Sequence, residues 1–239
     1  MARDFSFTFA KIADHFRQAL QTGYRVITCR EYVDYKKSGQ SDKILVNRVD
    51  IDFSCRKAGR LAAIFNELEI KASFFVRLHA PEYNPFSFEN YRRLRFIRDS
   101  GHEIGYHSEV IDEAAIWEED AAACLRRDIK VLRAMLDTVI YGVASHGGMT
   151  GLNNLDFWKD REPSDFDLLY EAYDDKSNFD LFNNSFYVSD SDWTSWKCYD
   201  RGKLKEGDQR NLAEHCRDGH RVIYSLIHPD TYFDEHFYE

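Results

Sequence analysis

The chain has 239 residues, of which 44% are hydrophobic and 15% aromatic, and its formal net charge is −9. This composition can form a packed core and is unlike that of a disordered chain. The acidic balance, without a long run of Lys or Arg, argues against nucleic acid as a partner, and no apolar run approaches the roughly 20 residues of a membrane-spanning helix.

Hydrophobic spacing predicts helices and strands that alternate along most of the chain. The clearest strand is at residues 44–53, which are rich in β-branched side chains and end in two carboxylates. Such alternation favours a parallel sheet or barrel with helices outside it. In chain order we first predict a helix at 7–20, a strand at 24–28 and a helical turn at 30–37. The strand at 44–53 is followed by a helix at 56–68, a strand at 72–76, a helix at 88–100, a strand at 103–107, a helix at 112–136 and a strand at 139–144. Then come long loops at 149–185 with short helices around 168–173, a helix at 209–217 and a strand at 222–227.

The N-terminus and the cysteines predict a cytoplasmic protein. Charged residues at Arg3 and Asp4 interrupt the apolar N-terminal residues, so we expect no secretory signal. The five cysteines are odd in number, scattered and without a CxxC pair, which is typical of free thiols in a reducing compartment.

Polar residues that can bind a metal or transfer a proton stand at four predicted strand ends. Asp50 and Asp52 end one strand, and His107, His146 and His228 end three others. In a parallel barrel all such ends lie on one face, so these residues are expected to form one site. Asp50 and Asp52 are two positions apart and therefore point to the same side.

Each of these residues also has an ordinary structural interpretation. Asp52 can cap the following helix, and a lone histidine is more often a hydrogen-bonded structural residue than a ligand. Glu109 can be a ligand, an orienting group or a surface acid. Residues 189–193 (SDSDW) place acids beside an indole, a combination that suits sugar binding but is also common in polar turns.

Several segments resemble the motifs of the polysaccharide deacetylase family. Residues 49–54 (VDIDFS) resemble its first motif in a D-x-D form, residues 101–108 (GHEIGYHS) its second, and residues 227–229 (IHP) its last. Asp192-Trp193 is similar to its pocket-lining Asp-Trp pair. The resemblance spans roughly residues 45–230. It implies an α/β fold of the deformed (β/α)7-barrel type, here a single domain over 1–239 with a helical and strand extension at about 1–43.

Two positions depart from the family pattern. Many members have a second metal-binding histidine four residues after the first, where this chain has Ile111. The usual Arg-x-Pro motif is replaced by Ser145-His146-Gly147. His146 can therefore supply the missing ligand or contact the catalytic acid, and this chain is a divergent branch.

The resemblance implies a metal-dependent hydrolase that removes an N-acyl group from an amino sugar. Asp52 and His107, with His146 or Glu109, would bind a divalent metal: zinc, or else cobalt, nickel or manganese. Asp50 would be the general base and His228 the general acid. The residues expected to bind substrate are Glu109, Asp190, Asp192 and Trp193.

The expected substrate is an acylated amino sugar, a sugar nucleotide or a lipid-linked saccharide in surface-polysaccharide (for example lipopolysaccharide) assembly. Two alternatives stay open: an inactive barrel that only binds sugar, and a metal hydrolase acting on another C–N or ester bond. The oligomeric state is not predicted.

Overall fold

The computed structural model describes residues 7–175 and 179–235. Its α-helices are α1 (Phe9–Gln21), α2 (Cys29–Ser38), α3 (Cys55–Glu67), α4 (Phe88–Asp99), α5 (Val110–Trp117), α6 (Ala121–Leu136), α7 (Leu181–Asn184) and α8 (Leu212–Asp218). Its strands are β1 (Arg25–Ile27), β2 (Ile44–Ile51), β3 (Ser73–Val76), β4 (Glu103–Ser108), β5 (Gly142–Ser145), β6 (Tyr170–Glu171), β7 (Phe186–Ser189), β8 (Lys197–Asp200), β9 (Lys203–Leu204) and β10 (Val222–Ile227). Short 3₁₀ helices lie at Asn154–Trp158, Pro163–Phe166 and Pro229–Thr231.

The strands form one mainly parallel sheet that curls into an open barrel. The order is β6-β5-β4-β3-β2-β10-β7, all parallel, followed by the antiparallel β8 and β9. Among the described residues no ladder joins β6 to β7, but the Tyr173 and Tyr187 hydroxyls lie 3.1 Å apart across this opening. The Tyr224 hydroxyl also donates a hydrogen bond to Ala172 O. The predicted α/β class is thus confirmed, with the last long strand, β10, beside β2.

The N-terminal residues are built into this sheet. β1 pairs with the first half of β2 in parallel register, Val26 opposite Leu45. α2 then closes the N-terminal end of the barrel, because its first amides bond to the beginnings of two strands: Cys29 N donates to Ser73 Oγ and Arg30 N to Glu103 Oε2.

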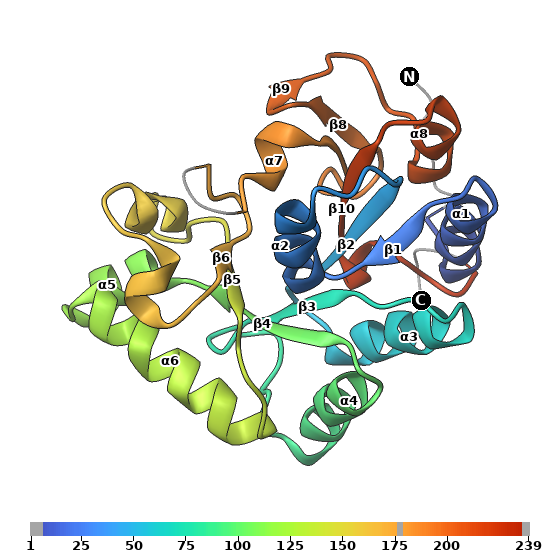
Figure 1. Cartoon of the computed structure of the whole chain (residues 1–239). Helices are drawn as coiled ribbons and strands as arrows, with labels where there is room; N and C mark the ends of the chain where they lie inside the picture. Colours follow the sequence, from blue (N-terminus) through green and yellow to red (C-terminus); the bar gives the residue numbers. More distant parts are fainter. Residues whose placement is uncertain (1–6, 176–178, 236–239) are drawn as a thin grey trace.

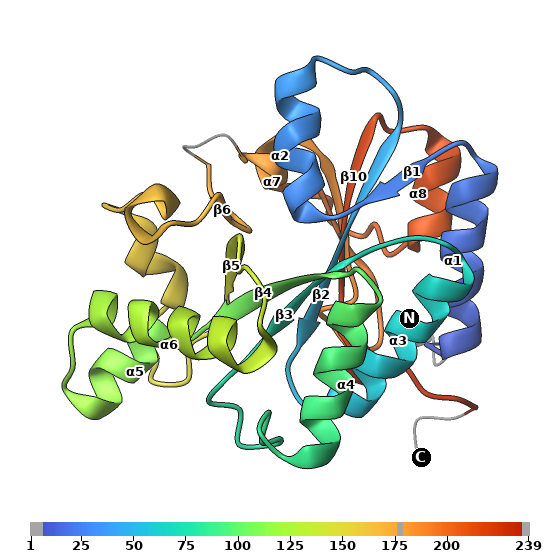
Figure 2. The same cartoon turned by 60° about the horizontal axis from the view of Figure 1, so that its bottom comes forward.

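Two apolar cores follow from the alternation of side chains along the strands. One lies inside the barrel and is rich in tyrosine, including Tyr170, Tyr187 and Tyr224. The other lies between the sheet and the outer helices. Figure 1 shows α3, α4 and α6 on the outside of the sheet, and Figure 2 shows α1 beside α8 along the same layer.

Two sequence predictions about elements are wrong, and some strands were not predicted. The helix predicted at 112–136 is two helices, because Glu118 adopts a left-handed conformation and Asp120 caps α6. Residues 168–173 contain the strand β6 and not a helix, since Tyr170 and Glu171 pair with β5. The strands β7, β8 and β9 were not predicted.

All five cysteines are buried and free. Within residues 7–175 and 179–235 no helix is long and apolar enough to cross a lipid bilayer. The aromatic residues near the end of the sequence, at 232–238, lie partly outside the described residues.

Candidate metal centre

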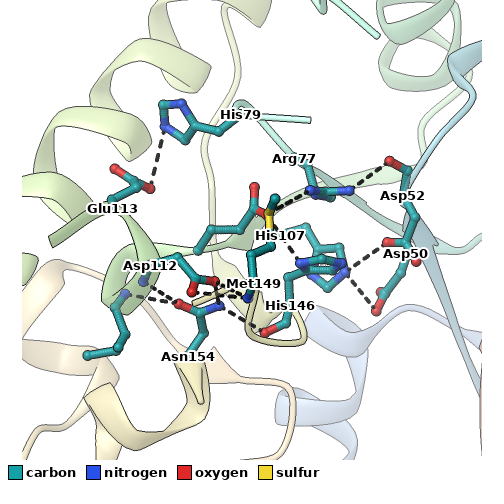
Figure 3. A network of polar contacts seen from close by, with 12 residues as sticks. Asp50, Asp52, Arg77, His79, His107, Asp112, Glu113, His146, Met149 and Asn154 are labelled. Carbon is teal, nitrogen blue, oxygen red and sulfur yellow. Dashed lines mark hydrogen bonds and ion pairs between the residues drawn. The ribbon is translucent and has the colours of Figure 1, made fainter. Parts of the chain in front are cut away.

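The five residues expected at strand ends all lie at the C-terminal edge of the barrel. Asp50 is near the end of β2 and Asp52 just beyond it, while His107 is near the end of β4. His146 follows β5 and His228 follows β10. Because the strands are parallel, these residues come close to one another at this edge, and Figure 3 shows Asp50, Asp52, His107 and His146 turned toward one another.

Asp52, His107 and His146 form a group with ligand spacing. One donor atom of each residue lies within 4.8 Å of the others, and Asp52 Oδ1 is 3.2 Å from His107 Nε2. His107 Nδ1 lies 2.8 Å from Ala144 O, which fixes this nitrogen as the donor and leaves the Nε2 lone pair facing Asp52. The two imidazole rings are 5.0 Å apart and nearly perpendicular.

These three residues fit a divalent metal. Asp52 Oδ1 is buried yet accepts no hydrogen bond from the described residues, and a buried carboxylate oxygen without a partner is costly. Burial alone would raise the pKa of Asp52, but the imidazoles of His107, His228 and His146 hold it below its ordinary value. Two imidazoles and one ionised carboxylate are a donor set that zinc and similar ions bind.

Asp50 is held from inside the barrel by Arg48, which sequence reasoning missed. Arg48 Nε and Nη2 donate to the two carboxylate oxygens at 2.8 and 2.7 Å, and both side chains are buried. Burial alone would raise the pKa of Asp50, but the guanidinium keeps it below its ordinary value. Asp50 Oδ2 also lies 3.4 Å from His107 Nε2, so this ionised group borders the metal-ligand set.

His228 lies beside Asp52 and is held by Asp190. Its Nδ1 is 2.6 Å from Asp190 Oδ1, its amide donates to the same carboxylate, and its Nε2 points into the site, 3.9 Å from Asp52 Oδ2. Burial alone would lower the pKa of His228, but Asp190 raises it to about 9. Asp190 itself is fully buried.

Glu109 is also buried and contacts protein groups. Its Oε1 lies 3.2 Å from His146 Nδ1 and accepts a hydrogen bond from Arg77 Nη2 at 2.8 Å. Arg77 in turn donates to the backbone oxygen of Asp52. Arg77, which follows β3 directly, therefore connects the two sides of the ligand group.

The loop after His146 is anchored by Asp112, on α5. The Asp112 carboxylate accepts hydrogen bonds from the amides of Met149 and Thr150 and from Asn154 Nδ2. Asn154 Nδ2 also donates to His146 O, and its Oδ1 accepts from the Ile111 amide. The position of His146 thus depends on a network beneath it, visible in Figure 3.

A pair of aromatic side chains lies beside His228. Trp193 stacks on Phe53 with ring centroids 5.6 Å apart and lies 5.9 Å from the ring of His228. Trp193 is 40% exposed and Phe53 39%, so both present apolar surface to solvent. Asp192 is exposed beside them.

No protein-family model matches the chain, and no curated protein matches it. A solved structure, the chitin deacetylase from the fungal pathogen Colletotrichum lindemuthianum, is similar with a TM-score of 0.43 and 13% identity, over 77% of this chain and 73% of that one.

Proposed function

We propose that this chain is a metal-dependent hydrolase that removes an N-acyl group, acetyl in the simplest case, from an amino sugar. One observation carries the proposal: a two-histidine, one-carboxylate group lies between an ionised aspartate, Asp50, and a histidine, His228, that is held by a carboxylate. Hydrolysis of an amide needs these parts, namely a polarised carbonyl, a base for water and an acid for the departing amine.

Asp52, His107 and His146 would hold the metal, with zinc as the first choice and cobalt, nickel or manganese as alternatives. A metal bound there supplies Lewis acidity and lowers the pKa of water. Asp50, kept ionised by Arg48, accepts a proton from the attacking water through Oδ2, the oxygen that lies 3.4 Å from His107 Nε2. His228 donates its Nε2 proton to the amine as the C–N bond breaks, and Asp190 stabilises the imidazolium before that transfer.

The four residues expected to bind substrate divide by burial. We assign Trp193 and Asp192, on the exposed rim, to binding the sugar ring and its hydroxyls. Asp190 and Glu109 are buried against His228 and His146, which supports roles as positioning residues. The proposed substrates are a free acylated amino sugar, its sugar nucleotide and a lipid-linked saccharide.

The test is acetate release from these three substrate types and from a simple aryl acetamide and an aryl ester, with metal-free and metal-reloaded protein. We expect release from an amino sugar that disappears with chelation and returns with metal. His228→Gln should lower kcat by ~10²–10⁴-fold with metal content unchanged. Activity that survives chelation contradicts the proposal, cleavage of only the ester or aryl amide indicates another hydrolase, and sugar binding without turnover indicates an inactive barrel.

A further inference from the structure

A second group of metal-binding side chains lies on the outer face of the barrel. It consists of Cys198 on β8, His215 on α8 and Asp208 on the loop that joins β9 to α8. β8 pairs with β7, and Figure 1 shows β8 and α8 near β10. None of the three residues belongs to the candidate metal centre, which is built from β2, β4 and the loop after β5.

Two of the three donor atoms lie close to the third, His215 Nε2. Cys198 Sγ lies 3.3 Å from His215 Nε2, and Asp208 Oδ1 lies 3.5 Å from the same atom. Cys198 and His215 are fully buried, and the Asp208 side chain is 14% exposed.

Hydrogen bonding alone explains only part of this arrangement. If the Cys198 thiol donates to His215 Nε2, that nitrogen has no hydrogen to offer the Asp208 carboxylate, 3.5 Å away. If Nε2 is protonated, its single hydrogen can serve only one of the two neighbours, and the thiol then has Arg210 O as its acceptor. A cation between the three atoms would contact the imidazole lone pair, the thiolate and the carboxylate oxygen at the same time.

We propose that Cys198, Asp208 and His215 bind a second divalent metal ion, with zinc as the preferred ion. Tetrahedral zinc binds sulfur at ~2.3 Å, imidazole nitrogen at ~2.0–2.1 Å and carboxylate oxygen at ~2.0–2.2 Å, which places neighbouring ligand atoms roughly 3.3–3.6 Å apart. The two measured separations lie within or at the edge of this range. Binding replaces the thiol proton, which passes to solvent.

The surroundings support this assignment of the ligand atoms. His215 Nδ1 is buried without a hydrogen-bond partner among the described residues, 3.8 Å from Asp218 Oδ2, while Nε2 is the ring nitrogen that faces Cys198 and Asp208. Arg210 donates to Asp208 through Nε and Nη2 and to Asp218 through Nη1. Asp208 Oδ1 accepts from both the amide and Nε of Arg210, so a metal bound to this oxygen would displace one of these two donors.

The metal would connect the strand β8, the loop that follows β9 and the helix α8. Asp208 belongs to the loop at 205–211, and α8 leads directly into β10, whose end carries His228. Three protein ligands leave a fourth position, which the partial exposure of Asp208 opens to water. A metal that binds only the folded chain stabilises it.

Cobalt(II) distinguishes this site from the candidate metal centre, because a cysteine thiolate bound to cobalt gives a near-ultraviolet charge-transfer absorption. Asp52, His107 and His146 cannot give that absorption. We expect the absorption when wild-type protein is titrated with cobalt, its loss in Cys198→Ser and its retention in His107→Ala. Elemental analysis after zinc loading should find one ion fewer in each single variant than in the wild type.

Two further variants keep the test decisive if Cys198→Ser does not fold. Asp208→Asn, on the loop, should weaken cobalt binding at the thiolate site by at least roughly tenfold. His220→Gln is the matched control, because His220 lies with Asp218 on the other side of His215 and should leave the absorption unchanged. Wild-type protein that binds cobalt without the charge-transfer absorption, or a signal lost in His220→Gln but kept in Asp208→Asn, overturns the proposal.

Discussion

Arg48 and Asp50 form a two-pronged ion pair inside the barrel, with N–O distances of 2.8 and 2.7 Å and side chains only 1% and 2% exposed. The guanidinium also lies over the ring of Tyr173, 4.5 Å from its centroid. Arg48 therefore compensates the charge of Asp50 from the protein interior, and Asp50 stays ionised where it borders the ligand group. This pair performs the balancing that two adjacent carboxylates, Asp50 and Asp52, require.

Arg48→Met should destabilise the protein strongly, because it leaves a buried carboxylate without its partner. We expect the free energy of unfolding to fall by about 3–5 kcal/mol, measured by urea denaturation of metal-free protein. Arg17→Met is the control, since Arg17 and Asp14 are about half exposed and 3.6 Å apart, and it should change the free energy by less than about 1 kcal/mol. Equal effects of the two variants would show that Asp50 is not compensated by Arg48.

The pH dependence of stability should contain a contribution from Glu113. Burial and the neighbouring Asp128 raise the pKa of Glu113 from 4.5 to about 7, against the smaller lowering effects of His79 and the Tyr106 hydroxyl. The folded chain therefore binds more protons than the unfolded chain between these values, and stability from this group falls as pH rises through that window. The Tyr106 hydroxyl lies 2.9 Å from Glu113 Oε1 and 2.7 Å from Asp128 Oδ2 and so bridges the two carboxyl groups.

Glu113→Gln removes this titration. We expect the variant to unfold with nearly the wild-type free energy at pH 5 and to be more stable than the wild type by about 1–2 kcal/mol at pH 8. Glu89→Gln, at an exposed position, should leave the pH profile unchanged. A Glu113→Gln profile parallel to that of the wild type would refute the raised pKa.

The network beneath His146 should control metal affinity without supplying a ligand. Asn154→Ala removes the hydrogen bonds to His146 O and to Asp112, so the loop that carries His146 loses its anchor. We expect metal to bind roughly 10–100-fold more weakly, measured by competition with a chromophoric chelator. Asn153→Ala is the matched control, because Asn153 only caps the following 3₁₀ helix. Equal metal affinities in the two variants would show that His146 is not a metal ligand.

The strand-end rule predicted which residues meet, because it depends only on the direction of parallel strands. Asp50, Asp52, His107, His146 and His228 all lie at that edge. The rule does not apply to Arg48, because this residue lies within β2 and not at its end. Its position two residues before Asp50, on the same face, was the available signal.

What the sequence did not predict depends on burial and long-range pairing. In the sequence, Asp190 resembles an acid that binds sugar hydroxyls. Only its complete burial shows that it contacts His228 instead. β6 is two residues long and exists because Tyr170 and Glu171 pair with β5, almost 30 positions earlier. Local propensity contains no information about such a pairing.

The stacked pair of Trp193 and Phe53 should contribute to substrate binding more than to the chemical step. The two rings stack on each other, and Trp193 lies next to His228. Neither ring carries a group that serves as acid or base in the proposed reaction. Trp193 adopts a left-handed backbone conformation, φ 60°, which turns its side chain at the point where the chain leaves β7. An indole that packs on a sugar ring stabilises substrate and transition state alike.

Trp193→Ala should therefore raise KM by roughly 3–10-fold with little change in kcat, because an aromatic contact contributes about 0.5–1.5 kcal/mol. Steady-state acetate release on the substrate found active above measures both constants. Trp117→Ala is the control: Trp117 is 44% exposed but packs on His79 at the end of α5, away from Phe53. A fall in kcat with unchanged KM in Trp193→Ala would instead assign Trp193 to positioning His228.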